Sequence, residues 1–197
     1  MNDHIRNLLD QITVLEDELH SAVQAQEGKL RYTIDGKRIA FEQAVQEAHA
    51  KLKMNVFRWV MTVRPQNFLT APFIYGMIVP LLIADASVSL FQAICFPVYR
   101  IAKVRRRDYI AYDYQHLAYL NFFEKFHCLY CAYADGLLAY SREIVARTEQ
   151  YFCPIKHARK ILHANARYRH FLDYGAAEDY HAKLEEFRAA LAREQAK

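Results

Sequence analysis

Residues 65–99 read PQNFLTAPFIYGMIVPLLIADASVSLFQAICFPVY, and this stretch decides how the rest of the chain is organised. It lies between Arg64 and Arg100 and contains one charged residue, Asp85. A helix that crosses a bilayer needs roughly 20 predominantly apolar residues. The stretch is too long for one straight pass and too short for two passes with a turn between them. It is the only part of the sequence apolar enough to enter a bilayer.

Polar residues and prolines predict a break within this stretch. Pro72, Pro80 and Pro97 each remove a backbone donor and bend or end a helix, and Asp85 is followed by two serines. We therefore expect a shallow or re-entrant hairpin with a first leg over 68–84 and a second over 88–99. One tilted span and a buried hairpin in the core of a soluble protein are the two alternatives.

The flanking charges favour a hairpin that returns to its own side. Basic residues precede the stretch and follow it, with a dense cluster over 100–107 (RIAKVRRR). Such residues favour the cytoplasmic side and are attracted to anionic lipid. The cluster adjoins the apolar segment, so membrane lipid is a better partner for it than nucleic acid. The chain starts without the pattern of a secretory signal, and we expect the hairpin to enter and leave the membrane on its cytoplasmic face.

The first 26 residues carry a heptad pattern. Apolar residues recur at alternating spacings of three and four, at Ile5, Leu8, Ile12, Leu15, Leu19 and Ala22. This pattern predicts either a coiled coil that forms a homodimer or a helix that packs within the chain. Residues 30–41 contain Asp35-Gly36, which suits a β-hairpin turn or a loop between two helices; we expect the helical version.

The remaining regions predict further helices. Apolar positions step by three and four over 38–63, which predicts an amphipathic helix. The unusually wide apolar face over 117–150 predicts one or two helices, punctuated by Gly136. Pro154 predicts the start of a helix that continues to about 163, and the last helix covers 177–196. The expected fold is all-α. Its regions are an N-terminal helical hairpin or coiled coil (1–64), a membrane-inserted helical hairpin (65–99) and a cytosolic helical bundle (100–197).

Three cysteines and a histidine have the spacing of a metal site. Cys128, Cys131, Cys153 and His157 form a C-x2-C-x21-C-x3-H pattern. Two short chelating pairs about 20 residues apart suit a tetrahedral ion, and thiolates with one imidazole suit zinc, iron or an iron–sulfur cluster. We predict that these four residues bind such a centre.

Other interpretations of the same residues stay open. Cys128 and Cys131 could form a redox-active dithiol, or the cysteines could simply pack in a helical core. Glu124 and His127 form the Glu-x-x-His pair that di-iron bundles use twice, although a second copy is missing. No phosphate-binding loop, nucleophile elbow or zinc-protease motif is present, so no specific motif supports catalysis.

Three segments carry a resemblance to a known family. FQAICFPVYRIAKVRRRDYIAYDYQHLAYLN (91–121), CLYCAYADGL (128–137) and RTEQYFCPIKHA (147–158) resemble an uncharacterised bacterial family of membrane-associated proteins. The resemblance covers roughly 65–180, and its Cys-x-x-Cys and Cys-Pro-Ile-Lys-His motifs are the most specific parts. It implies a bacterial inner-membrane location and no particular activity.

The function expected from the sequence is therefore that of an inner-membrane-associated protein with a zinc or iron centre in its cytosolic helical domain. A membrane-anchored coiled-coil scaffold without metal is the first alternative. A di-iron or dithiol oxidoreductase is the second.

Overall fold

The computed structural model describes residues 11, 14–15, 18–19, 21–22, 32–35, 38–41, 43–159, 161 and 165–195. The regular secondary structure of this part of the chain is helical apart from one small sheet, which confirms the predicted helical fold class. The chain divides into two compact units, Met1–Thr62 with Asp113–Lys125, and Val63–Tyr112 with Phe126–Lys197.

The first unit contains a β-hairpin where we expected two helices joined by a loop. Strands β1 (Tyr32–Asp35) and β2 (Arg38–Phe41) pair antiparallel, and Asp35 lies opposite Arg38. The expectation of a helical hairpin at this point was wrong, and the alternative that Asp35-Gly36 also allowed is the observed one. Most of the predicted coiled coil over 1–26 lies outside the described residues; Leu15 and Leu19 are helical and exposed.

The single amphipathic helix expected over 38–63 is interrupted. Helix α2 covers Gln43–Lys51 and helix α3 covers Val56–Thr62. Asn55 starts α3, because its side-chain oxygen accepts a hydrogen bond from the backbone N–H of Phe57 at 3.1 Å. Trp59 of α3 stacks on Phe123, with ring centroids 5.5 Å apart, so it packs on an aromatic partner within its own unit.

The apolar stretch forms one nearly continuous helical segment in place of the expected hairpin. Helix α4 covers Pro65–Gly76, helix α5 covers Ile78–Val98, and Met77 between them keeps a right-handed helical conformation. Helix α5 passes without a break through Asp85, so the predicted division at this residue was wrong. Pro80 is tolerated because it lies in the first turn of α5, where a missing N–H costs no intrahelical bond.

The end of α5 is set by a Schellman motif. Arg100 adopts a left-handed backbone conformation with φ of 55°, and the N–H of Ile101 donates to the carbonyl of Phe96 at 2.8 Å. The turn buries Ile101 and directs the following segment, with the short helix η1 (Arg106–Asp108), onto the face of α6.

Helix α6 is a single helix from Phe122 to Phe152. Asn121 and Glu124 form a reciprocal cap: the Asn121 side-chain oxygen accepts from the Glu124 N–H, and the Glu124 carboxylate accepts from the Asn121 N–H. The short helix η2 (Tyr114–His116) precedes this cap. Gly136, where the sequence also allowed a division into two helices, lies within this single helix and is buried.

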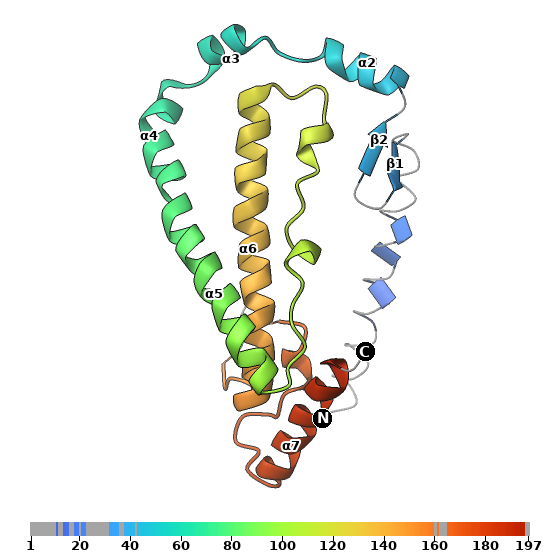
Figure 1. Cartoon of the computed structure of the whole chain (residues 1–197), viewed down its shortest axis with the longest axis vertical. Coiled ribbons are helices and arrows are strands. Elements are labelled where there is room, and N and C mark those ends of the chain that lie inside the picture. The colour runs from blue at the N-terminus through green and yellow to red at the C-terminus, as the bar shows by residue number, and fades with distance from the viewer. Residues whose placement is uncertain are drawn as a thin grey trace. The chain divides into compact units, whose positions relative to one another are not determined.

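The second unit has one hydrophobic core between α5, the segment after it, α6 and helix α7 (Tyr180–Gln195). Figure 1 shows α5 beside the C-terminal part of α6. The buried members are Phe96, Ile101, Val104, Ile110, Tyr133, Leu137, Tyr140, Ile144 and Leu191.

Helix α7 confirms the last predicted helix, starting at Tyr180 rather than 177. The helix expected to follow Pro154 is absent from residues 153–159 and 161, where Ile155 pairs with Leu172 in an isolated bridge.

Candidate functional site

The four predicted metal ligands lie in two separate places. Cys128 and Cys131 lie one turn apart on α6, with Cys128 partly buried and Cys131 exposed. Cys153 follows the last residue of α6 and is exposed. His157 lies in the non-helical segment beyond it, where its backbone N–H donates to the Tyr168 hydroxyl at 2.6 Å and its ring stacks on Tyr168.

The unbroken helix α6 keeps these two places apart. A rise of about 1.5 Å per residue puts Cys128 about 36 Å from Phe152, the residue before Cys153. Ligands of one tetrahedral ion lie within about 4 Å of each other, since metal–ligand bonds are roughly 2.0–2.3 Å long. The structure therefore does not bring the four residues of one chain to a single ion. Within the described residues, no three or more His, Cys, Asp or Glu side chains form a metal-binding group.

The Glu-x-x-His pair is engaged elsewhere. The Glu124 carboxylate caps the first turn of α6, as described above, and the His127 ring packs on Tyr75 with centroids 5.8 Å apart. These contacts assign Glu124 a structural role at the start of the helix.

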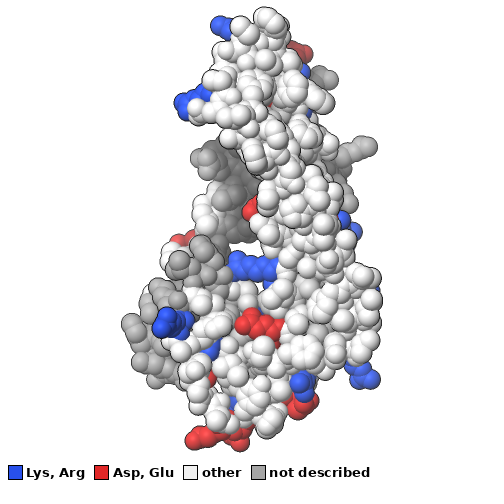
Figure 2. All heavy atoms as spheres, turned by 90° about the vertical axis from the view of Figure 1, so that its left-hand side faces the viewer, with Lys and Arg blue, Asp and Glu red and all other residues white. Residues whose placement is uncertain are grey.

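An extensive apolar surface of the second unit is the outward side of α4 and α5. Pro65–Val98 is long and apolar enough to cross a membrane, and only 11% of its most apolar window is buried. Figure 2 shows this face almost free of charged side chains. Its large exposed residues are Phe68, Leu69, Phe73, Ile74, Met77, Val79, Leu82, Ile83, Leu90, Phe91, Ile94 and Val98.

The inward side of α5 carries the polar residues of the stretch. Asp85 is 7% exposed, and its carboxylate pairs with the guanidinium of Arg106 at 2.5 Å. The same carboxylate accepts hydrogen bonds from the hydroxyls of Tyr133, at 3.0 Å, and Ser89, at 3.3 Å. Burial, and then the hydrogen bond to Asp85, raise the pKa of Tyr133, so its hydroxyl remains a donor at neutral pH.

A second polar contact fastens the segment after α5 to the same face. Gln92 is buried two turns after Asp85, and its side-chain oxygen accepts from the Val104 N–H at 2.5 Å. Its amide nitrogen donates to the Tyr140 hydroxyl at 2.8 Å and to the Val104 carbonyl at 3.3 Å. The spacing of Asp85, Ser89 and Gln92, which places them on one helical face, is the sequence signal for this arrangement.

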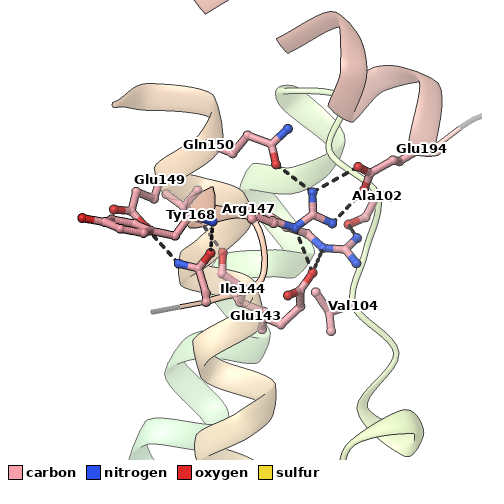
Figure 3. Close-up of polar contacts among 12 residues, drawn as sticks. Ala102, Val104, Glu143, Ile144, Arg147, Glu149, Gln150, Tyr168 and Glu194 are labelled. Carbon is pink, nitrogen blue, oxygen red and sulfur yellow. Dashed lines mark hydrogen bonds and ion pairs between the residues drawn. The ribbon is translucent and has the colours of Figure 1, made fainter. Parts of the chain in front are cut away.

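An ion-pair network at the C-terminal end of α6 was not predicted from the sequence (Figure 3). Glu143 accepts from Arg147 at 2.8 Å and from Arg167 at 3.1 Å, and Arg167 also binds both carboxylate oxygens of Glu194. Burial disfavours the charge of Arg167, but the bonds to Glu194 and the charge of Glu143 outweigh it and raise its pKa. Arg147 donates to the Ala102 carbonyl at 2.6 Å, which ties the segment after α5 to α6.

Comparisons with protein-family models, with curated proteins and with solved structures found no match.

Proposed function

We propose that this protein is a membrane-anchored scaffold. In this proposal the outward side of α4 and α5 enters the bilayer, both ends of the segment stay on one face, and the helical unit built on α6 and α7 is held at the surface. The exposed apolar side of α4 and α5 is the observation that carries the proposal.

The free energy of this surface argues against leaving it in water. Burying a large apolar side chain stabilises by about 1.5–3 kcal/mol, so half-exposed residues forgo about 1 kcal/mol each. For the twelve residues of this face the sum is on the order of 10 kcal/mol. Exposed apolar patches of this extent mark membrane or protein contacts.

Charge at the ends of the segment supports lipid as the contact. Arg64 precedes α4, and Arg100, Lys103, Arg105 and Arg107 follow α5. Each basic residue near an anionic surface contributes about 1 kcal/mol. Since both ends are basic, the proposal places them on the cytoplasmic face. The family resemblance adds the bacterial inner membrane as the location. The inward side of the segment contacts α6 along its length: the backbone carbonyl of Ile74 accepts a hydrogen bond from Tyr130, and Gln92 donates one to Tyr140. Because α6 covers this side, the proposal has only the opposite side enter the bilayer.

The Cys128–Cys131 pair supports a second candidate function. Its two sulfurs lie one turn apart, and Cys131 is exposed. This arrangement suits a dithiol that binds a soft metal ion or undergoes thiol–disulfide exchange.

A homodimer through residues 1–26 stays part of the scaffold proposal.

Flotation of the full-length protein with vesicles containing anionic lipid tests the anchor. Leu69, Phe73 and Ile83, replaced together by Gln, should abolish flotation while leaving the helical circular-dichroism signal unchanged. The matched control replaces Leu138 and Val145, which are similarly exposed on α6, by Gln and should still float. A triple variant that floats like the wild type, or a wild type that forms a soluble oligomer without binding vesicles, would contradict the proposal.

Reporter fusions at the two termini test the one-sided insertion. We expect both reporters to be active on the cytoplasmic face. Reporters on opposite faces would show a single span instead.

A further inference from the structure

A pocket of about 350 Å³ lies where the segment after α5 meets α6 and the end of α7. Its lining includes Lys103, Arg105, Tyr109, Arg147 and Glu194, all from the second unit. Figure 3 shows Arg147 and Glu194 converging beside Ala102 and Val104, which also line it. None of its lining residues is a cysteine or belongs to the apolar face.

The lining has an excess of positive charge. Lys103, Arg105 and Arg147 contribute three cations, and Glu194 contributes the single carboxylate. Arg167 binds both oxygens of that carboxylate at 3.1 and 2.8 Å, which offsets its charge. Arg105 is paired with Asp108 on the surface. Arg147 is paired with Glu143, so Lys103 is the lining cation without an ion-pair partner among the described residues, and it gives the pocket its preference for an anion.

Several hydrogen-bond donors of the pocket have no acceptor among the described residues. Arg147 uses Nε for Glu143 and Nη1 for the Ala102 carbonyl, which leaves Nη2 available. The Lys103 ammonium and the Tyr109 hydroxyl have no hydrogen-bond partner within the described residues either. Burial, and then the charge of Glu143, raise the pKa of Tyr109, so its hydroxyl is a donor at neutral pH.

We propose that this pocket binds a phosphate group through Arg147, Lys103 and Tyr109. A fixed guanidinium, a mobile ammonium and a hydroxyl donor are the groups that recognise phosphate oxygens, and charge-assisted bonds of this kind are the strong ones. Arg147 is held in place by Glu143 and Ala102, so its free Nη2 is already oriented. The phosphate belongs either to a soluble phosphomonoester or to the headgroup of an anionic lipid. A lipid headgroup is included because the pocket residues within 102–109 follow α5, the helix proposed to enter the bilayer.

Two binding measurements on the full chain in neutral detergent test the proposal and separate these sources. The first titrates the protein with inorganic phosphate and with glycerol 3-phosphate by calorimetry. The second measures retention of phosphatidic acid against diacylglycerol by native mass spectrometry. Lys103→Glu should weaken binding about tenfold or more, because it replaces a charge-assisted bond with repulsion. Lys183→Glu, the same charge change on the exposed side of α7, should leave it unchanged.

Saturable binding of the soluble phosphates that depends on Lys103 identifies a soluble ligand, and Lys103-dependent retention of phosphatidic acid alone identifies a lipid headgroup. Tyr109→Phe should weaken the same interaction without the charge change. Absence of binding in both measurements, or equal losses for Lys103→Glu and Lys183→Glu, would overturn the proposal. Neither measurement depends on membrane insertion, so the outcome is independent of the anchor.

Discussion

The carboxylate of Asp85, in the middle of the apolar segment, is paired with the guanidinium of Arg106, which lies in the segment that follows α5. The pair is asymmetric: the Asp85 side chain is 10% exposed, whereas the Arg106 side chain is 47% exposed. Arg106 can therefore be solvated when its partner is removed, but Asp85 cannot.

This asymmetry predicts unequal effects of removing the two partners. Arg106→Ala leaves a buried carboxylate without its counter-charge and should lower the free energy of unfolding by about 1–3 kcal/mol. Asp85→Asn keeps an acceptor for Tyr133 and should cost less than about 1 kcal/mol. Chemical denaturation of both single variants and the double variant measures the coupling. Equal and additive losses would show that the pair is not a unit.

Gly136 predicts a second, steric effect. A Cβ at this position would lie 2.6 Å from the Tyr109 carbonyl oxygen and 2.9 Å from the Ile110 Cα, both of them backbone atoms. Gly136→Ala should therefore destabilise by about 1–3 kcal/mol, even though alanine is the better helix former. Gly76→Ala is the matched control, because nothing lies within 4 Å of the place that its methyl group would take, and it should be neutral or slightly stabilising. Thermal unfolding of both variants decides between these outcomes.

The predictability of the fold differs from one residue to the next. The Asn121–Glu124 pair is a recognisable capping signal, and it places the start of α6 correctly, later than the apolar pattern alone suggests. Asp85 was expected to break the helix, because a charged residue in an apolar stretch needs partners. Its partners Arg106 and Tyr133 are distant in the sequence and cannot be inferred from the local pattern. Asp85 can stay within a helix once those partners satisfy its charge.

The metal-site hypothesis also depended on long-range packing that the local sequence pattern does not show. The spacing of Cys128, Cys131 and Cys153 suits two chelating pairs only if the chain folds back between them, and a glycine such as Gly136 suits a turn of that kind. Instead Gly136 is the point where Tyr109 and Ile110 approach the helix closely. A glycine required for close packing and a glycine required for a turn look alike in one sequence.

The separation of the cysteines can be measured directly. Spin labels on Cys128 and Cys153, with Cys95 and Cys131 replaced by serine, should give a distance distribution centred near the helical separation of about 36 Å, broadened by the label linkers. The continuous helix α6 is the physical reason. Strong dipolar broadening of the continuous-wave spectrum, which requires labels in close proximity, would contradict this separation and support a single site formed by the four predicted ligands.

His170 predicts a weak dependence of stability on pH. Burial lowers its pKa below the ordinary value of 6.5, and the charges of Arg169 and Lys156 lower it further. Because the unfolded state then binds the proton more readily, stability should fall as pH drops below about 6.5. The side chain is largely exposed, so the effect is small. Its pKa, measured by proton NMR titration, should lie below the ordinary value and rise in Arg169→Gln; an unchanged value in that variant would exclude the charge effect.

Depth of insertion tests the membrane anchor most directly. Single spin labels on the outward side of the segment, at Leu69, Phe73, Ile83 and Leu90, should become accessible to oxygen and protected from a water-soluble nickel chelate in anionic vesicles. Labels at Leu81 and Val88, which pack against the core, should show low accessibility to both reagents. Outward labels that stay accessible to the nickel chelate, or that are protected equally with and without vesicles, would contradict the account.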